Sequence, residues 1–116
     1  MVLLSFSSSC SKEKEMSKYV EYVPCNEADD YQNTFSGKIA KILSNNCAVS
    51  GCHDAITHEQ GLDYTTYSSA VNSFGVIALC SIYQDGSCQP MPRNAPKLSD
   101  ADIHDLCCWV KSDYPK

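Results

Sequence analysis

Two cysteines and a histidine near the middle of the chain are the residues best placed to do chemistry. Cys47 and Cys52 enclose four residues, and His53 follows the second cysteine directly. A Cys-His dipeptide preceded by another cysteine is typical of covalent haem attachment, in which each thiol adds across one vinyl group. The histidine then serves as an axial ligand of the iron. The usual motif has two residues between the cysteines, so this loop is larger than usual.

The same residues fit two other kinds of site. Zinc would take Cys47, Cys52 and His53 with a fourth ligand such as His58, because zinc binds cysteine and histidine at comparable spacings. However, adjacent Cys52 and His53 would strain simultaneous binding to one small ion, and an oxidising compartment removes free thiols. The other alternative is a disulfide-stapled secreted binding module without haem.

The composition indicates one small domain that matures in an oxidising compartment. The chain has 116 residues, enough for one domain, and its eight cysteines are typical of proteins outside the cytosol. A formal charge of −5 disfavours binding to nucleic acid or anionic lipid and suits a protein partner with a basic docking patch. No apolar run reaches the roughly 18 residues that a membrane-spanning helix needs.

The N-terminal residues resemble the end of a bacterial lipoprotein signal. They are uncharged and partly apolar and lead to Cys10, which would carry the lipid anchor. The segment lacks a basic region and is short, which a truncated start would explain; a leader with a spare cysteine is the alternative. We expect a signal over 1–10, a flexible polar tether over 11–33 and a domain over 34–116. The expected location is the cell envelope, periplasmic or surface-exposed.

The segment before the motif has the pattern of an amphipathic helix. Thr34 is a candidate N-cap, and Asn45-Asn46 is a candidate end because asparagine tolerates the left-handed conformation. A shorter helix is expected around 66–73, whereas periodicity leaves the apolar run 76–79 open between strand and helix. The first helix is predicted over 34–44, with apolar residues on one face: Phe35, Ile39, Ile42 and Leu43.

The last helix is the clearest predicted element. Ser99 and Asp102 have the spacing of a capping box variant. Before this helix, Met91 lies between two prolines, which favour a rigid extended loop. Apolar residues then follow at helical spacing: Ile103, Leu106, Cys107 and Val110.

Taken in order, these features resemble a small class I c-type cytochrome, of the kind found as a domain in bacterial envelope proteins. The resemblance covers roughly residues 34–112, and attachment sites with four intervening residues occur as variants in that family. It implies an all-α, cytochrome c-like fold packed around one haem. Four features match in order: the helix over 34–44, the motif at 47–53, a Gly-Leu-Asp and tyrosine segment over 61–67, and the Met91-Pro92 loop followed by the capped last helix with Trp109. In that family the first and last helices cross, here through Phe35, Ile39, Leu43, Leu106, Trp109 and Val110.

The resemblance also implies the second axial ligand and the function. The family carries a methionine ahead of the last helix, and Met91 occupies that place. The expected site is therefore Cys47, Cys52, His53 and Met91, holding one covalent haem c. His/Met ligation raises the reduction potential, and a methionine on the sixth position keeps substrates from the iron. The expectation is an electron carrier for redox protein partners, not an enzyme; an open sixth position for peroxide or gas chemistry is the variant.

Other residues around the motif have weaker implications. His58 lies too close to His53 to reach the opposite face of a haem, and His104 fits a solvated residue of the last helix. A bis-histidine site using His104 stays open. Arg93 and Lys97 either offset the haem propionates or are ordinary surface cations. Three aromatic residues line the haem or pack in the core: Tyr64, Tyr67 and Trp109.

The remaining cysteines predict disulfides. Cys80 and Cys88 bracket a turn, so a local disulfide is expected. Cys107 and Cys108 pair poorly with one another, because neighbours on a helix point about 100° apart. One of them should pack in the core, and the other should reach Cys25 or Cys88.

Overall fold

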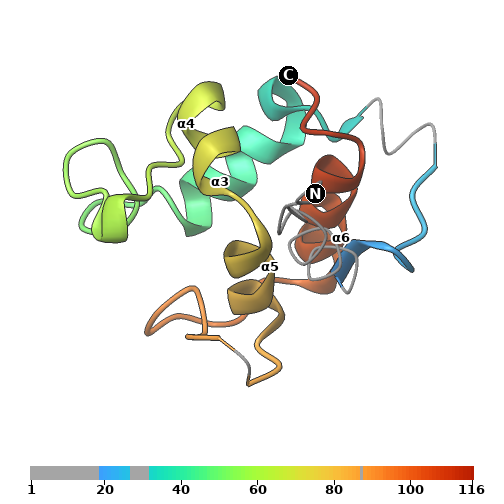
Figure 1. Ribbon diagram of the computed structural model, residues 1–116. Coiled ribbons are helices and arrows are strands. Elements are labelled where there is room, and N and C mark those ends of the chain that lie inside the picture. The colour runs from blue at the N-terminus through green and yellow to red at the C-terminus, as the bar shows by residue number, and fades with distance from the viewer. Residues whose placement is uncertain (1–18, 27–31, 87) are drawn as a thin grey trace, which may run out of the picture.

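The computed structural model describes residues 19–26, 32–86 and 88–116, and the signal predicted over 1–10 lies outside them. Within these ranges the chain forms helices and connecting loops without a β-strand, in agreement with the all-α prediction (Figure 1). No helix in this part of the chain is long and apolar enough to cross a membrane. The elements are η1 (Phe35–Ile39), α3 (Ala40–Asn46), η2 (Glu59–Gly61), α4 (Tyr67–Ser73), α5 (Val76–Tyr83) and α6 (Asp100–Lys111).

The helix predicted over 34–44 is found as η1, a short π-helical turn, running directly into α3. Thr34 caps it, accepting a hydrogen bond of 3.1 Å from the Gly37 amide. Gly37 is kinked out of helical geometry, and a Cβ there would lie 2.8 Å from the Gln32 carbonyl oxygen. This close approach of two backbone segments leaves room only for glycine.

α3 ends at the predicted asparagine pair, but not through a left-handed asparagine. Cys47, the C-cap, has φ −121°, so the chain does not turn through a left-handed residue here. Instead, the Asn46 side-chain amide donates to the Ile42 carbonyl at 2.8 Å. The amides of Cys47 and Ala48 both donate to the Leu43 carbonyl. The carbonyls of Ile42 and Leu43 thus gain donors at the helix end without glycine or left-handed asparagine.

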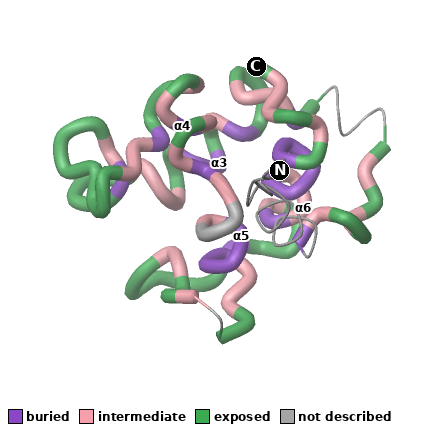
Figure 2. Tube along the Cα trace, in the orientation of Figure 1, coloured by how far each residue is buried: buried purple, intermediate pink, exposed green. Residues whose placement is uncertain are grey.

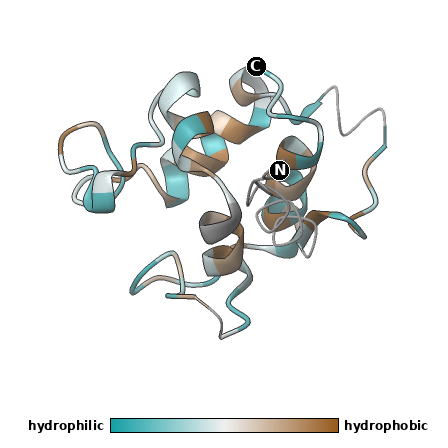
Figure 3. Cartoon of the chain, viewed as in Figure 1, coloured by the Kyte–Doolittle hydropathy of each residue, from teal (hydrophilic) through white to brown (hydrophobic). Residues whose placement is uncertain are grey.

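α6 is the centre of the core. Ser99 caps it as predicted, accepting a 3.1 Å hydrogen bond from the Asp102 amide. The helix carries apolar and polar residues (Figure 3), and the buried ones extend beyond the predicted stripe (Figure 2). Its buried residues are Ile103, Leu106, Cys107, Cys108, Trp109 and Val110. Each fully buried large apolar side chain contributes about 2 kcal/mol to folding.

The first and last helical segments contact one another, as expected. η1 lies against α6, and the rings of Phe35 and Trp109 have centroids 6.3 Å apart. Phe74 and Tyr114 pack edge-on against the same indole at 5.8 and 4.9 Å. Trp109 is fully buried, so it is a core residue.

Residues 19–26, part of the segment 11–33 in which a flexible tether is expected, pack against the helices. Tyr19 is buried, and its ring lies 5.2 Å from that of Tyr83 on α5. The Lys111 ammonium donates to the Val23 carbonyl at 2.9 Å. A polar segment can thus be ordered by a few apolar side chains and its own backbone carbonyls. Residues 11–18 and 27–31 lie outside the described residues.

Two disulfides join the cysteines as predicted. Cys80 pairs with Cys88, and Cys108 pairs with Cys25 across 83 residues of sequence. Cys107 remains a free, fully buried thiol. Its pKa is raised by burial, with a smaller opposing effect from the Tyr83 hydroxyl.

Candidate functional site

A cavity of about 1510 Å³ brings together two segments that are distant in the sequence. One is the motif loop (residues 47–53), and the other is the methionine loop (residues 89–99), which leads into α6. All four predicted site residues line this cavity: Cys47, Cys52, His53 and Met91. Sites for small organic ligands usually measure roughly 300–1000 Å³, so this cavity has room for a larger ligand.

The motif loop closes on itself through backbone hydrogen bonds. The His53 amide donates to the Cys47 carbonyl at 3.1 Å, and the Cys52 amide donates to the Val49 carbonyl at 3.0 Å. Gly51 has φ +85°, a conformation that glycine adopts without steric cost. The four intervening residues therefore form a compact turn, and both thiols remain on the wall of the same cavity.

His53 is held in one orientation. Its Nδ1 lies 3.1 Å from the carbonyl oxygen of Glu59. Because a carbonyl only accepts, Nδ1 carries the proton in the neutral ring and Nε2 keeps a lone pair. Tyr64 packs edge-on against the imidazole at 5.2 Å, and its amide donates to the His53 carbonyl at 3.0 Å. A carbonyl bound to the far nitrogen is the usual support of a metal-binding histidine.

Glu59 has a role in the site that its residue type does not indicate. It acts through its backbone at the start of η2, so its residue type carries no signal. The Glu59 amide also donates to the Cys52 carbonyl at 2.9 Å. η2 therefore braces both the second cysteine and the histidine of the motif.

The two motif cysteines are unpaired although the same chain forms two disulfides. Cys52 is exposed, whereas Cys47 is half-buried. Burial, with a smaller effect of Cys52, raises the pKa of Cys47 to about 12. Cys47 is consequently a protonated thiol at neutral pH, a weak nucleophile towards adventitious reagents.

Met91 is fixed by the end of α5. Its amide donates to the Ser81 carbonyl at 3.1 Å, and its carbonyl accepts from the Gln84 side-chain amide at 3.0 Å. The Cys80–Cys88 disulfide braces the segment between them. The methionine side chain is half-buried against the cavity.

The other residues singled out in the sequence divide into two groups. Tyr64, Arg93 and Lys97 line the cavity, and both cations are exposed. Burial, followed by the effect of Cys47, raises the pKa of Tyr64. Tyr67 and Trp109 are not among the lining residues; the Tyr67 hydroxyl donates to the Tyr114 carbonyl.

His104 differs from the solvated histidine that the sequence predicted. Its Nε2 lies 2.8 Å from the Pro24 carbonyl oxygen and 3.5 Å from the Cys108 sulfur. It is not among the cavity-lining residues, so the bis-histidine alternative using His104 has no support in this arrangement.

The zinc alternative at the motif is also unsupported. Within the described residues, the group with histidine and cysteine ligand atoms close enough for one ion is Cys25, His104 and Cys108, and two of these form a disulfide. His58 is exposed, and its Nδ1 lies 3.3 Å from the Ala55 carbonyl oxygen.

No family model, curated protein or solved structure matches this chain. The functional interpretation therefore depends on the cavity and the residues that line it.

Proposed function

We propose that this protein is a monohaem c-type cytochrome that carries single electrons in the cell envelope. Cys47 and Cys52 would bind haem c covalently, and His53 and Met91 would be its axial ligands. The observation that carries this proposal is that all four residues line one large cavity, although Met91 comes from a different loop. A bacterial cytochrome c-like fold is part of the same proposal.

The chemistry of the donor set fits the group. The two unpaired thiols of Cys47 and Cys52 would supply the two thioether bonds, by addition of each S–H across a vinyl C=C of the haem. The Glu59 carbonyl orients the imidazole through Nδ1 and leaves Nε2 as the donor atom. The thioether sulfur of Met91 would be the second iron ligand beside His53, and a thioether favours reduced iron. When bound, the group supplies a reversible one-electron change at iron.

The walls suit a large, mainly apolar ligand with an anionic edge. Leu62, Phe74 and Leu98 are among the lining residues and give the cavity apolar walls. Arg93 and Lys97 lie on the same cavity and could pair with carboxylates at an exposed edge. Since Met91 would fill the remaining axial position, we propose an electron carrier and not an enzyme.

The partners and location follow from charge and cysteine use. The chain has a formal charge of −5, which favours docking to a basic patch on a redox protein. Disulfides belong to oxidising compartments, in line with the envelope. Membrane attachment would come only through a lipid at Cys10, which lies outside the described residues.

The decisive experiment is co-expression of the full chain with a haem-maturation system. We expect one added haem mass on the intact protein and a sharp α band in the reduced visible spectrum. A Cys47→Ser/Cys52→Ser variant should lose both signals, whereas Cys107→Ser, which alters the free thiol in the core, should keep them. Folded protein that gains no haem mass would sink the proposal and favour a disulfide-stapled binding module.

A further inference from the structure

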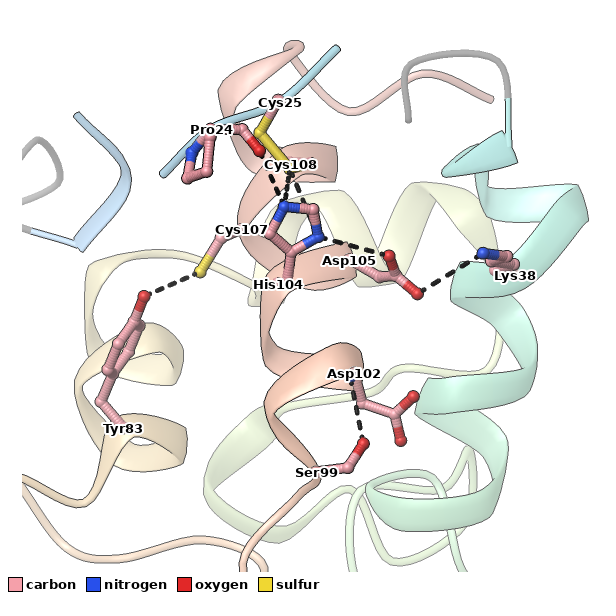
Figure 4. Close-up of polar contacts among 10 residues, drawn as sticks. All are labelled: Pro24, Cys25, Lys38, Tyr83, Ser99, Asp102, His104, Asp105, Cys107 and Cys108. Atoms are coloured by element: carbon pink, nitrogen blue, oxygen red, sulfur yellow. Dashed lines mark hydrogen bonds and ion pairs between the residues drawn. A yellow bond between two sulfur atoms is a disulfide. The ribbon is translucent and has the colours of Figure 1, made fainter. Parts of the chain in front are cut away.

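A second cluster of reactive side chains surrounds the Cys25–Cys108 disulfide, on the other side of the helices from the motif loop (Figures 1 and 4). His104 and Cys108 are one helical turn apart on α6, where side chains share a face. His104 Nε2 lies 3.5 Å from the Cys108 sulfur, and Nδ1 lies 4.0 Å from it. None of the three residues lines the cavity of the proposed haem site.

The nitrogen nearest to the disulfide is a hydrogen-bond donor. His104 Nε2 lies 2.8 Å from the Pro24 carbonyl oxygen, which can only accept, so Nε2 carries a proton. Asp105 Oδ1 lies 3.7 Å from Nδ1, and Lys38 holds the other carboxylate oxygen at 3.8 Å. Nε2 therefore donates its one N–H to the Pro24 carbonyl, and the Cys108 sulfur lies 3.5 Å from the same nitrogen, with a carboxylate beside Nδ1.

The two sulfur-bearing residues differ in access. Cys25 is half-buried on the segment 19–26, between the exposed residues Pro24 and Asn26. Cys108 is only 1% exposed, beneath that segment. An incoming thiol therefore reaches Cys25, and Cys108 becomes the leaving sulfur. Exchange is faster when the leaving thiolate is stabilised.

We propose that Cys25–Cys108 is a thiol-exchange site for a dithiol reductant, with His104 stabilising the departing thiolate. One thiolate of the reductant attacks the Cys25 sulfur and forms a mixed disulfide. The Cys25–Cys108 bond breaks, and its electron pair leaves with Cys108. As Pro24 moves away with the released Cys25, the Nε2 N–H of His104 turns from the Pro24 carbonyl to the Cys108 thiolate. The second thiol of the reductant then attacks the reductant's own first sulfur in the mixed disulfide. This closes the reductant's disulfide and releases the Cys25 thiolate.

The electrons and protons of this exchange balance. Two electrons pass from the dithiol, which becomes a disulfide, to Cys25 and Cys108, which become thiols. The two protons lost by the reductant are taken up by the two new thiols. The exchange removes the covalent link between residues 19–26 and α6.

The chain contains its own comparison for this reaction. Of its three histidines, His53 lines the cavity, His58 lies in the loop before η2 and His104 lies on α6. The Cys80–Cys88 disulfide leads into the methionine loop, and within the described residues no histidine nitrogen contacts either of its sulfurs as His104 contacts Cys108. The two disulfides can be followed in one sample by alkylation of the released thiols.

The test uses the full chain with a limiting amount of dithiothreitol, acid quenching and peptide mass spectrometry. We expect Cys25–Cys108 to open before Cys80–Cys88. His104→Ala should slow the opening of Cys25–Cys108 roughly tenfold, since a hydrogen bond to a thiolate is lost. The opening of Cys80–Cys88 should not change, and His58→Ala should alter neither rate.

General destabilisation of the fold by His104→Ala can be distinguished from loss of the His104 hydrogen bond, because it changes the rate of disulfide opening in the opposite direction. A variant that merely destabilised the protein would expose Cys108 and open Cys25–Cys108 faster, which would overturn the role of His104. Opening of Cys80–Cys88 first would overturn the site itself. With a monothiol probe, the trapped adduct should be on Cys25, and an adduct on Cys108 would contradict the proposed direction of attack.

Discussion

His53 Nδ1 lies 3.1 Å from the carbonyl oxygen of Glu59, six residues further along the chain. This single contact selects the tautomer of the imidazole and leaves Nε2 as its lone-pair donor. It is a backbone contact, so a change of the Glu59 side chain should leave it intact. The motif histidine is thus positioned before any ligand binds.

His53 can be tested separately from covalent attachment. We expect His53→Gln to keep both thioether bonds and hence the haem mass, because Cys47 and Cys52 are untouched. The sharp low-spin spectrum should be lost, since the strong axial nitrogen is absent. Glu59→Gln should leave spectrum and mass unchanged. A normal spectrum in His53→Gln would show that another residue binds the iron.

Met91 should control access to the sixth position. In Met91→Ala the reduced protein should bind carbon monoxide at neutral pH, which the unaltered protein should not do. Met91→His should refill the position and lower the reduction potential, because a thioether favours ferrous iron more than imidazole does. Asn94→Asp, an exposed change in the same loop at a residue that does not line the cavity, is the control. Carbon monoxide binding by the unaltered protein would exclude Met91 as a ligand.

The half-buried thiol of Cys47 should make the stability of the apoprotein fall in alkali. Burial, with a smaller contribution from Cys52, raises its pKa from 9.0 to about 12 in the folded state. Above pH 9 the unfolded chain therefore binds fewer protons than the folded one, so stability decreases as pH rises. The maximum slope for one group is about 1.4 kcal/mol per pH unit.

Urea unfolding of apoprotein between pH 8 and about pH 11 measures this slope. Cys47→Ser should flatten it, whereas Ser50→Ala, an exposed change in the same loop, should not. An unchanged slope in Cys47→Ser would show that Cys47 ionises equally in both states.

Gly37 should be intolerant of a side chain. A Cβ at this position would lie 2.8 Å from the Gln32 carbonyl oxygen and 2.9 Å from Thr34 Oγ1. We expect Gly37→Ala to reduce the free energy of unfolding by about 1–3 kcal/mol, because backbone must move. Gly75→Ala is the matched control, since its Cβ meets nothing within 4 Å. Equal effects of the two changes in urea unfolding would contradict the close approach.

The two disulfides should differ in their contribution to stability. Loop-closure entropy gives about 4.6 kcal/mol for the 83-residue separation of Cys25 and Cys108, and about 2.5 kcal/mol for the 8-residue separation of Cys80 and Cys88. Double serine variants of each pair, unfolded in urea, measure the difference. A larger loss from the short loop would show that native-state contacts, not chain entropy, dominate.

Much of the local structure could be read from residue types. Thr34 and Ser99 are N-caps as predicted, because their hydroxyls satisfy amides of the following turn. Cys107 and Cys108 separated into core and disulfide, as their helical geometry requires. Such features depend on a few neighbouring residues, so the sequence specifies them directly.

Features set by distant backbone contacts could not be read in this way. Residues 19–26 look like a polar linker, yet carbonyls of Val23 and Pro24 accept hydrogen bonds from α6. Every residue carries a carbonyl, so composition does not mark those that are used. Periodicity likewise left residues 76–79 open because α5 is apolar on nearly all sides.

The Cys25–Cys108 disulfide also determines how the protein would bear a mechanical load. A pull on the chain upstream of residue 25 would pass through the disulfide directly into α6. The motif loop and the methionine loop lie between residues 25 and 108, inside the loop that this disulfide closes. The force would therefore bypass both loops and the cavity that they line. Tension applied to the chain upstream of Cys25 would thus leave the spacing of His53 and Met91 unstrained.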